Sequence, residues 1–283
     1  MKKQFIVILS GIFLIIILFV FGRTVSNKKN IAVTAKDVVH QNSFDVAQFI
    51  NSEKAKLTPN QIITLSKLEN NITRGDVASQ QIIAYEALAA FWKDSVKSFE
   101  PYAFYTSSAS KLVNSEKNLT FAARIFLDNL RGEKDEARLN WQTAEAIDLF
   151  ERALKLNPNN DELKIGLGST YIYGKGRNGN PEETMQGIQQ LLAVVRKDST
   201  NMDAQMMLGV GGLVSGQFDK SIERLKKVVT AQPQNGEAVA YLADAYAGKG
   251  DKANAVKWYN ISKRLINNPH YTDEVDERIK TLK

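Results

Sequence analysis

Two glycine-rich segments of the chain are the first candidates for chemistry, because loops of this kind bind nucleotide phosphates. The segment 168–175 lacks the spacing of a phosphate-binding loop, and Gly176 stands where that loop needs Ser or Thr. The segment 209–211 lacks the third glycine of a dinucleotide-binding turn, since Val214 occupies that position. No strand-like segment precedes either one. We therefore expect no nucleotide cofactor.

Other catalytic chemistry also finds few candidates. The chain contains no cysteine, which excludes disulfides, thiolate metal sites, a cysteine nucleophile and an acylated cysteine anchor. His40 falls in a polar linker and His270 in a turn after Pro269, and we interpret both as exposed and inert. The acids lie at helix faces and helix starts, where solvent and the helix dipole stabilise them and no catalytic role is needed to explain them. With no nucleophile–base pair in the sequence, we predict no catalytic residue, no metal, no cofactor and no enzyme activity.

The elements that would position any site follow a repeat with a period of 34 residues. Three pairs of positions carry it: Leu208 and Leu242, Gly209 and Ala243, and Leu225 and Tyr259. Small residues alternate with bulky ones in these units, as close packing of crossing helices requires. A period in this range predicts stacked helical units, none of which buries a core alone.

Two earlier units share the phase of this repeat. One opens at Asp161 and needs about seven extra residues between its helices, which the turn-forming segment 174–181 supplies. Another is recognised by its second helix, with Ala146, Phe150 and Ala153, and its first helix is predicted over 119–130.

This unit resembles the tetratricopeptide repeat, a helix–turn–helix module. The family pattern is carried by Leu242, Ala243, Tyr246, Ala255 and Tyr259 in one unit and by Leu167, Gly168, Tyr171, Leu208, Gly209, Leu225 and Pro233 in others. The resemblance implies an all-α fold, an α-solenoid of such repeats over 115–270, with a C-terminal capping helix over 271–283.

The rest of the chain divides by composition. No strand-period run occurs, and 44–114 is predicted to hold helices, either degenerate repeats or an N-terminal cap. Thr58-Pro59 is a strong helix start, and Glu100-Pro101 is expected to end a helix. The segment 23–43 is polar and basic and is interpreted as a tether.

Residues 5–21 form an uncharged apolar run that would span about 25 Å as a helix, near the ~30 Å of a bilayer core. We predict a transmembrane signal anchor over 1–22, a cleaved signal peptide being the alternative. The anchor would place the bulk of the chain outside the cytoplasm, in a bacterial envelope (periplasmic). Basic residues on both sides of the run leave the positive-inside rule close to a tie.

Charge argues against nucleic acid as a partner. The formal net charge is +6, and nearly all of it comes from Lys2, Lys3, Arg23, Lys28 and Lys29, which flank the apolar run. The folded part is close to neutral, so we expect no binding to a phosphate backbone.

The resemblance also implies where a protein partner would bind, because the first helix of each tetratricopeptide unit (helix A) lines a concave groove. The family's groove positions correspond here to Glu162, Ile165, Ser169, Ile172, Asp203, Met206, Val210, Leu213, Glu237, Ala240, Asp244 and Ala247. The lysines and asparagines that some members use to hold a peptide carboxylate are absent from these positions. An apolar groove with acids predicts an apolar or basic helix or peptide as partner.

We therefore predict a membrane-tethered scaffold or adaptor that binds a protein or peptide. An assembly or maturation factor for an envelope or cytochrome complex is the alternative, and a groove that holds only a segment of the same chain is a further one.

Overall fold

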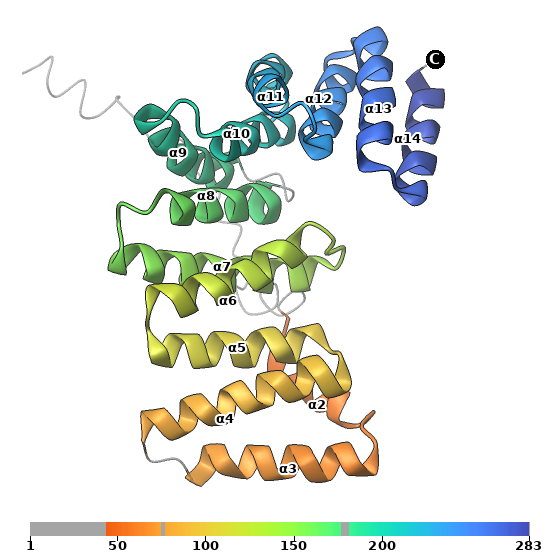
Figure 1. Cartoon of the computed structure of the whole chain (residues 1–283). Coiled ribbons are helices and arrows are strands. Elements are labelled where there is room, and N and C mark those ends of the chain that lie inside the picture. Colours follow the sequence, from red (N-terminus) through yellow and green to blue (C-terminus); the bar gives the residue numbers. More distant parts are fainter. Residues whose placement is uncertain (1–43, 75–76, 177–180, 283) are drawn as a thin grey trace, which may run out of the picture. The chain divides into compact units, whose positions relative to one another are not determined.

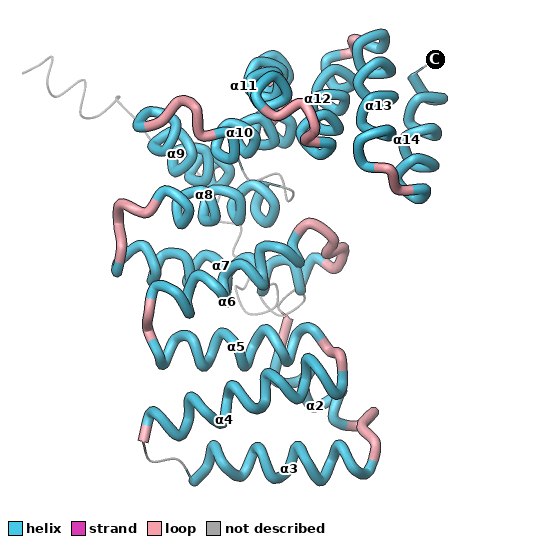
Figure 2. Tube along the Cα trace, in the orientation of Figure 1, coloured by secondary structure: helices cyan, strands magenta, loops and turns pink. Residues whose placement is uncertain are grey.

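The computed structural model describes residues 44–74, 77–176 and 181–282, and its described residues are helical with no strand (Figures 1 and 2). The predicted all-α class is confirmed for this part of the chain. The helices are α2 (Val46–Lys54), α3 (Pro59–Arg74), α4 (Ala78–Ala90), α5 (Phe99–Val113), α6 (Glu116–Leu130), α7 (Glu136–Leu156), α8 (Asp161–Thr170), α9 (Pro181–Lys197), α10 (Met202–Val214), α11 (Phe218–Ala231), α12 (Gly236–Lys249), α13 (Lys252–Ile266) and α14 (Pro269–Leu282).

Within the described part, no helix is both long and apolar enough to cross a membrane. The predicted anchor and the tether that follows it, together residues 1–43, lie outside the described residues, as does His40.

Two helices are prolonged by π-helical turns. α4 continues through Phe91–Val96 (η1) and stops at Lys97, whose φ of 62° no helix can continue. α8 continues through Tyr171–Lys175 (η2), so part of the extra sequence predicted before α9 lengthens this helix instead of forming a loop. Residues 177–180 are outside the description.

The prediction for Glu100-Pro101 is wrong. Both residues lie in the first turn of α5, which begins at Phe99, and they end nothing. Proline is tolerated there because the first turn of a helix has no partner for its backbone N–H groups. The Thr58-Pro59 start is confirmed, since the amide of Gln61 donates to Thr58 Oγ1 (3.4 Å) and the amide of Thr58 donates to Gln61 Oε1 (3.0 Å).

Asparagine side chains cap the N-termini of three later helices. Asn160, Asn201 and Asn235 precede α8, α10 and α12, and each accepts a hydrogen bond from a backbone amide of the first helical turn. Such a cap satisfies an amide that has no partner inside the helix. These asparagines fix where three successive helix A segments start.

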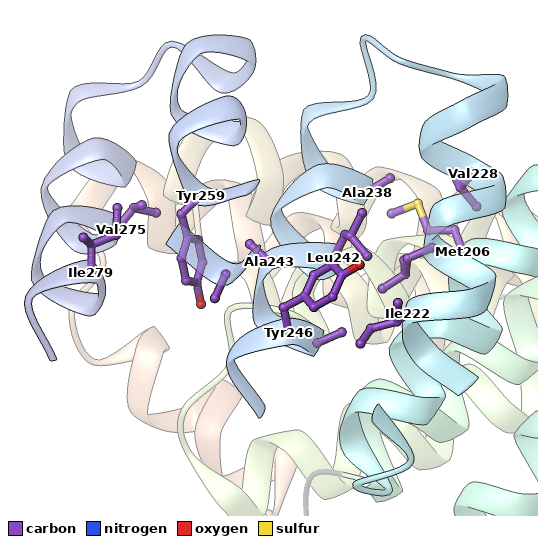
Figure 3. Packing of buried hydrophobic residues seen from close by; sticks show 13 residues of the cluster. Met206, Ile222, Val228, Ala238, Leu242, Ala243, Tyr246, Tyr259, Val275 and Ile279 are labelled. Carbon is purple, nitrogen blue, oxygen red and sulfur yellow. The ribbon is translucent and has the colours of Figure 1, made fainter. Parts of the chain in front are cut away.

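The helices pack chiefly against their neighbours in sequence, in pairs such as α6 with α7, α10 with α11 and α12 with α13. The residues of the predicted repeat pattern supply the core. Leu242, Ala243 and Tyr259 are buried between α12 and α13, and Val275 and Ile279 of α14 extend the same cluster (Figure 3). α14 thereby covers the end of the last pair.

Glycine allows α10 and α11 to approach each other closely in the core. A Cβ atom built on Gly209 of α10 would lie 2.6 Å from Cγ of Leu225 in α11. At the same crossing, the Ser221 hydroxyl donates to the Gly209 carbonyl oxygen over 2.7 Å. The glycines of α10 therefore serve helix packing, as the sequence predicts, and bring two backbones together.

We expect Gly209→Ala to lower the free energy of unfolding by about 1–3 kcal/mol, because the added methyl group overlaps the buried Leu225. This loss opposes the gain of up to ~1 kcal/mol that alanine brings to a helix. Urea denaturation followed by circular dichroism measures the difference. Gly132→Ala is the control, since the nearest atom to its new Cβ is 4.0 Å away. A Gly209→Ala protein at least as stable as the parent would contradict the close approach.

Candidate partner-binding surface

The candidate surface is formed by the helix A segments α6, α8, α10 and α12, with α4 and η1 before them. We call it the helix A surface. α6 contributes Lys117, Phe121, Arg124 and Asp128, which follow one another at helical spacing along one face. Phe121 is 57% exposed, unusual for a phenylalanine on a helix.

A polar hollow of about 460 Å³ lies between α6, α8 and α10. Its lining includes four of the predicted groove residues, namely Glu162, Ile165, Ser169 and Asp203. The other lining residues are Arg124, Leu127, Asp128 and Gly166. Four residues that the repeat pattern assigned to the groove therefore lie together at one hollow of α8 and α10. Residues of α6 form the rest of its lining.

Three acids from three helices face this hollow. Asp128, Glu162 and Asp203 are all exposed or half-buried residues. Arg124 is the basic residue among the lining side chains, and it pairs with Glu162 over 3.0 Å. Since that pair is exposed to solvent, it contributes little to stability and can exchange for a pair with a ligand. The hollow is thus net acidic with small apolar areas at Leu127 and Ile165.

A second hollow of about 400 Å³ lies between α4, η1, α5 and α6, and the sequence reasoning missed it. It is lined by Glu86, Ala89, Ala90, Lys93, Asp94, Tyr102, Thr106, Ala109, Ser110, Lys117, Asn118 and Phe121. The signal present in the sequence is the helical spacing of Lys117 and Phe121, which share one face of α6. It does not suffice by itself, because 44–114 has no clear repeat register that would show which helices lie opposite this face.

Several predicted groove residues pack inside the repeats instead. Ile172 is fully buried, Val210 is 3% exposed and Met206 is 8% exposed. Ser169 is 5% exposed, at the floor of the polar hollow. These side chains contribute mainly to the packing between helices. Leu213, Ala240 and Ala247 are half-buried and pack at the edge of the core or beside it.

Glu237 is held by a cluster that joins distant units. Its carboxylate oxygen accepts from Arg131 (2.6 Å) and from the Tyr241 hydroxyl (3.2 Å). The Tyr241 hydroxyl lies 3.1 Å from that of Tyr173, and the Arg131 guanidinium stacks over the Tyr173 ring at 4.8 Å. Burial raises the pKa of Tyr241 and of Tyr173, so both stay neutral at physiological pH. The cluster ties the α6–α7 turn to α12.

Asp244 is likewise engaged within the chain. Its Oδ1 accepts from the Tyr259 hydroxyl, at a separation of 2.5 Å, and from Arg278 Nη1 at 3.0 Å. Burial raises the pKa of this carboxyl, against the opposing effects of Tyr259 and Arg278. The contact joins α12, α13 and α14. Asp244 therefore holds the C-terminal helix, and a partner would have to displace Arg278 to reach it.

The described residues contain no cluster of three or more His, Asp or Glu side chains suited to a metal ion. His270 is exposed, with Nδ1 3.6 Å from a carboxylate oxygen of Glu274 one turn along α14.

Comparisons with known proteins find a similar family over the C-terminal repeats. Residues 213–268 match the family model described as tetratricopeptide repeat, which agrees with the resemblance carried by the 34-residue period. Proteins built from this repeat generally bind protein or peptide partners. Among solved structures, the thermophilic tetratricopeptide protein TTC0263 of Thermus thermophilus is similar to this chain with a TM-score of 0.52 and 14% identity. The similarity covers 71% of this chain and 98% of that one, and it shows the fold alone.

Two curated proteins share sequence with the chain. BBSome complex member BBS4 of Bos taurus is 28% identical over 177 residues, which are 59% of this chain and 33% of that protein. Cellulose synthase operon protein C of Escherichia coli strain K12 is 42% identical over 62 residues, or 22% of this chain and 5% of that protein. The chain thus spans a third or less of the length of these relatives.

We expect Asp244→Ala to lower the free energy of unfolding by roughly 1–3 kcal/mol, because it leaves Arg278 and the hydroxyl of the buried Tyr259 without this acceptor. Amide hydrogen exchange in α14 should also become faster. Asp203→Ala removes an exposed carboxylate of the same helix A surface and should leave both measurements unchanged. Equal exchange of α14 in the two variants would show that Asp244 does not hold this helix.

Proposed function

We propose that the protein is a non-enzymatic scaffold that binds a protein partner through the helix A surface. Residues 5–21 tether it to a membrane, and the bulk of the chain lies outside the cytoplasm. The helical-repeat fold supports the general role, because stacked repeats present extended surfaces of this kind. The tether and the orientation are supported by the uncharged apolar run at the N-terminus.

The observation that carries the proposal is the acidic hollow between α6, α8 and α10. Its carboxylates come from three helices, while Leu127 and Ile165 offer apolar contact beside them. A segment that combines basic and apolar side chains satisfies both features at once. The partner is thus an apolar or basic segment that binds at Asp128, Glu162 and Asp203. Glu237 and Asp244 are already bonded within the chain and contribute less to its binding.

A tether would make even a modest affinity effective. A partner embedded in or bound to the same membrane meets the scaffold at a high effective concentration, so the second contact costs less than it would between two free molecules. The exposed, screened charges of the hollow fit such reversible capture better than they fit a permanent complex.

We expect the double substitution Asp128→Lys and Asp203→Lys to weaken binding of a fluorescein-labelled helical peptide, with leucine on one face and lysine on the other, by about tenfold or more. The reason is that like charges would then face each other in the hollow. Fluorescence anisotropy with the full chain gives the dissociation constant, and circular dichroism verifies the helix content. Asp273→Lys on α14 is the control, since Asp273 is exposed and lines neither hollow. Undiminished binding by the double variant would place the partner elsewhere.

We expect proximity labelling in intact cells, from a tag fused after Lys283, to mark extracytoplasmic proteins and a short reproducible set of neighbours. Labelling confined to cytoplasmic proteins would reverse the proposed orientation. If the neighbours form one complex and its unassembled subunit accumulates when the gene is deleted, the assembly-factor role is favoured over the adaptor role.

A further inference from the structure

A second groove lies between α9 and the α10–α11 pair, and it shares no lining residue with the two hollows of the helix A surface. It consists of two adjoining hollows of about 350 and 320 Å³. Both are lined by Met185 and Ile188 of α9 and by Ser215 and Gln217 of the α10–α11 turn. We call it the α9–α11 groove. The repeat pattern gave no reason to expect a site here.

The α9 wall of the groove is an apolar stripe. Met185, Ile188 and Leu192 follow at intervals of three and four residues and therefore share one helix face. Leu191 and Val194 of α9 are fully buried in the core, and Ile188 and Leu192 are half-buried and pack against it. Met185, in contrast, is 46% exposed. The stripe therefore presents an exposed apolar side chain beside two half-buried ones.

Apolar residues of α10 face this stripe. Val214 is 40% exposed and lines the hollow at one end, while Leu208 and Gly212 line the other. Exposed apolar residues scattered singly need no explanation, but here two of them, Met185 and Val214, line the same concave site. A flexible methionine also lets such a surface fit the side chains of a partner.

The charges that line the groove are all positive. Lys220 and Arg224 stand on α11 one turn apart, and among the described residues that line the groove there is no carboxylate. Lys220 donates to Gln217 (2.7 Å) and Arg224 donates to Gln205 (2.8 Å), so neutral groups position both cations. The nearby acids Glu223 of α11 and Glu183 of α9 pair with other residues, Lys227 at 2.9 Å and Lys175 at 3.4 Å.

Charge also decides between possible occupants. The apolar N-terminal segment of the chain itself is flanked by Lys2, Lys3, Arg23, Lys28 and Lys29 and has no acid within its first thirty residues. It would bring positive charge to a positive rim. A partner segment with apolar side chains beside carboxylates matches both the wall and the rim.

We propose that the α9–α11 groove binds an amphipathic acidic segment of a partner protein. Apolar side chains of that segment lie against Met185, Ile188 and Val214, and its carboxylates pair with Lys220 and Arg224. The chain then carries two docking surfaces of opposite character, one acidic on helix A and one basic beside α11, and can hold two different partners at once.

The test uses a fluorescein-labelled helical peptide with leucine on one face and glutamate on the other, titrated with the full chain and followed by anisotropy. Met185→Glu should weaken binding about tenfold, because it removes an apolar contact and places a carboxylate beside the glutamates of the peptide. Lys220→Glu should weaken it about threefold or more. Met185 and Lys220 are both exposed, and Lys220 donates a hydrogen bond to Gln217. We therefore expect both variants to fold. The control Lys252→Glu reverses an exposed charge on α13 and should change nothing.

Three results would overturn the proposal. The first is no measurable binding of the glutamate peptide. The second is binding that neither Met185→Glu nor Lys220→Glu alters, which would locate the peptide elsewhere. The third is a dimeric chain that Met185→Glu turns into a monomer while the peptide fails to bind, which would make a second copy the occupant. The α9–α11 groove and the acidic hollow share no lining residue. Asp203→Lys, which alters only the acidic hollow, should therefore not weaken binding of the glutamate peptide.

Discussion

Close approach of paired helices is the constraint on which the described structure depends. At the α10–α11 crossing, Gly209 leaves room for the fully buried Leu225, and the Ser221 hydroxyl donates to the Gly209 carbonyl. At the α8–α9 crossing, a Cβ atom on Gly168 would lie 2.9 Å from the carbonyl oxygen of Gly187. Protein interiors are packed too densely to absorb an extra methyl group at such points. Small residues at the crossings therefore determine how the helices of a pair lie against each other.

That packing fixes which faces remain for a partner. Once Leu208 and Leu242 point into the pairs, residues such as Asp203 lie at the surface of the same helix A segments. The α8–α10 part of the helix A surface thus follows from the crossings. The groove beside α9 is what the pairs leave partly uncovered, with Met185 exposed while Leu191 and Val194 are buried in the core.

Contacts between residues 34 positions apart connect successive units. Tyr173 with Met207 and Asp244 with Arg278 are such pairs in the C-terminal repeats. The salt bridge between Lys111 and Glu145 has the same separation and extends the spacing into α5. Equivalent residues of adjacent units therefore lie close together, even where the sequence pattern of the repeat has faded. Glu237 and Asp244 are both used in contacts between units, whereas Asp203 lies exposed at the polar hollow.

The amino-acid sequence alone predicts the helical class, the period, core residues such as Leu242 and Tyr259, and the close approach of helices at Gly209. These features are local or periodic, and periodicity shows directly which faces are buried. The sequence could not determine that Asp244 is held by Arg278, that Glu237 is reached by Arg131 from another unit, or that Met185 and Val214 face one groove beside Lys220. Those facts depend on how separate helices are juxtaposed. A pattern of residue types records which face of a helix is apolar, but only the tertiary structure decides which side chain from another helix meets it.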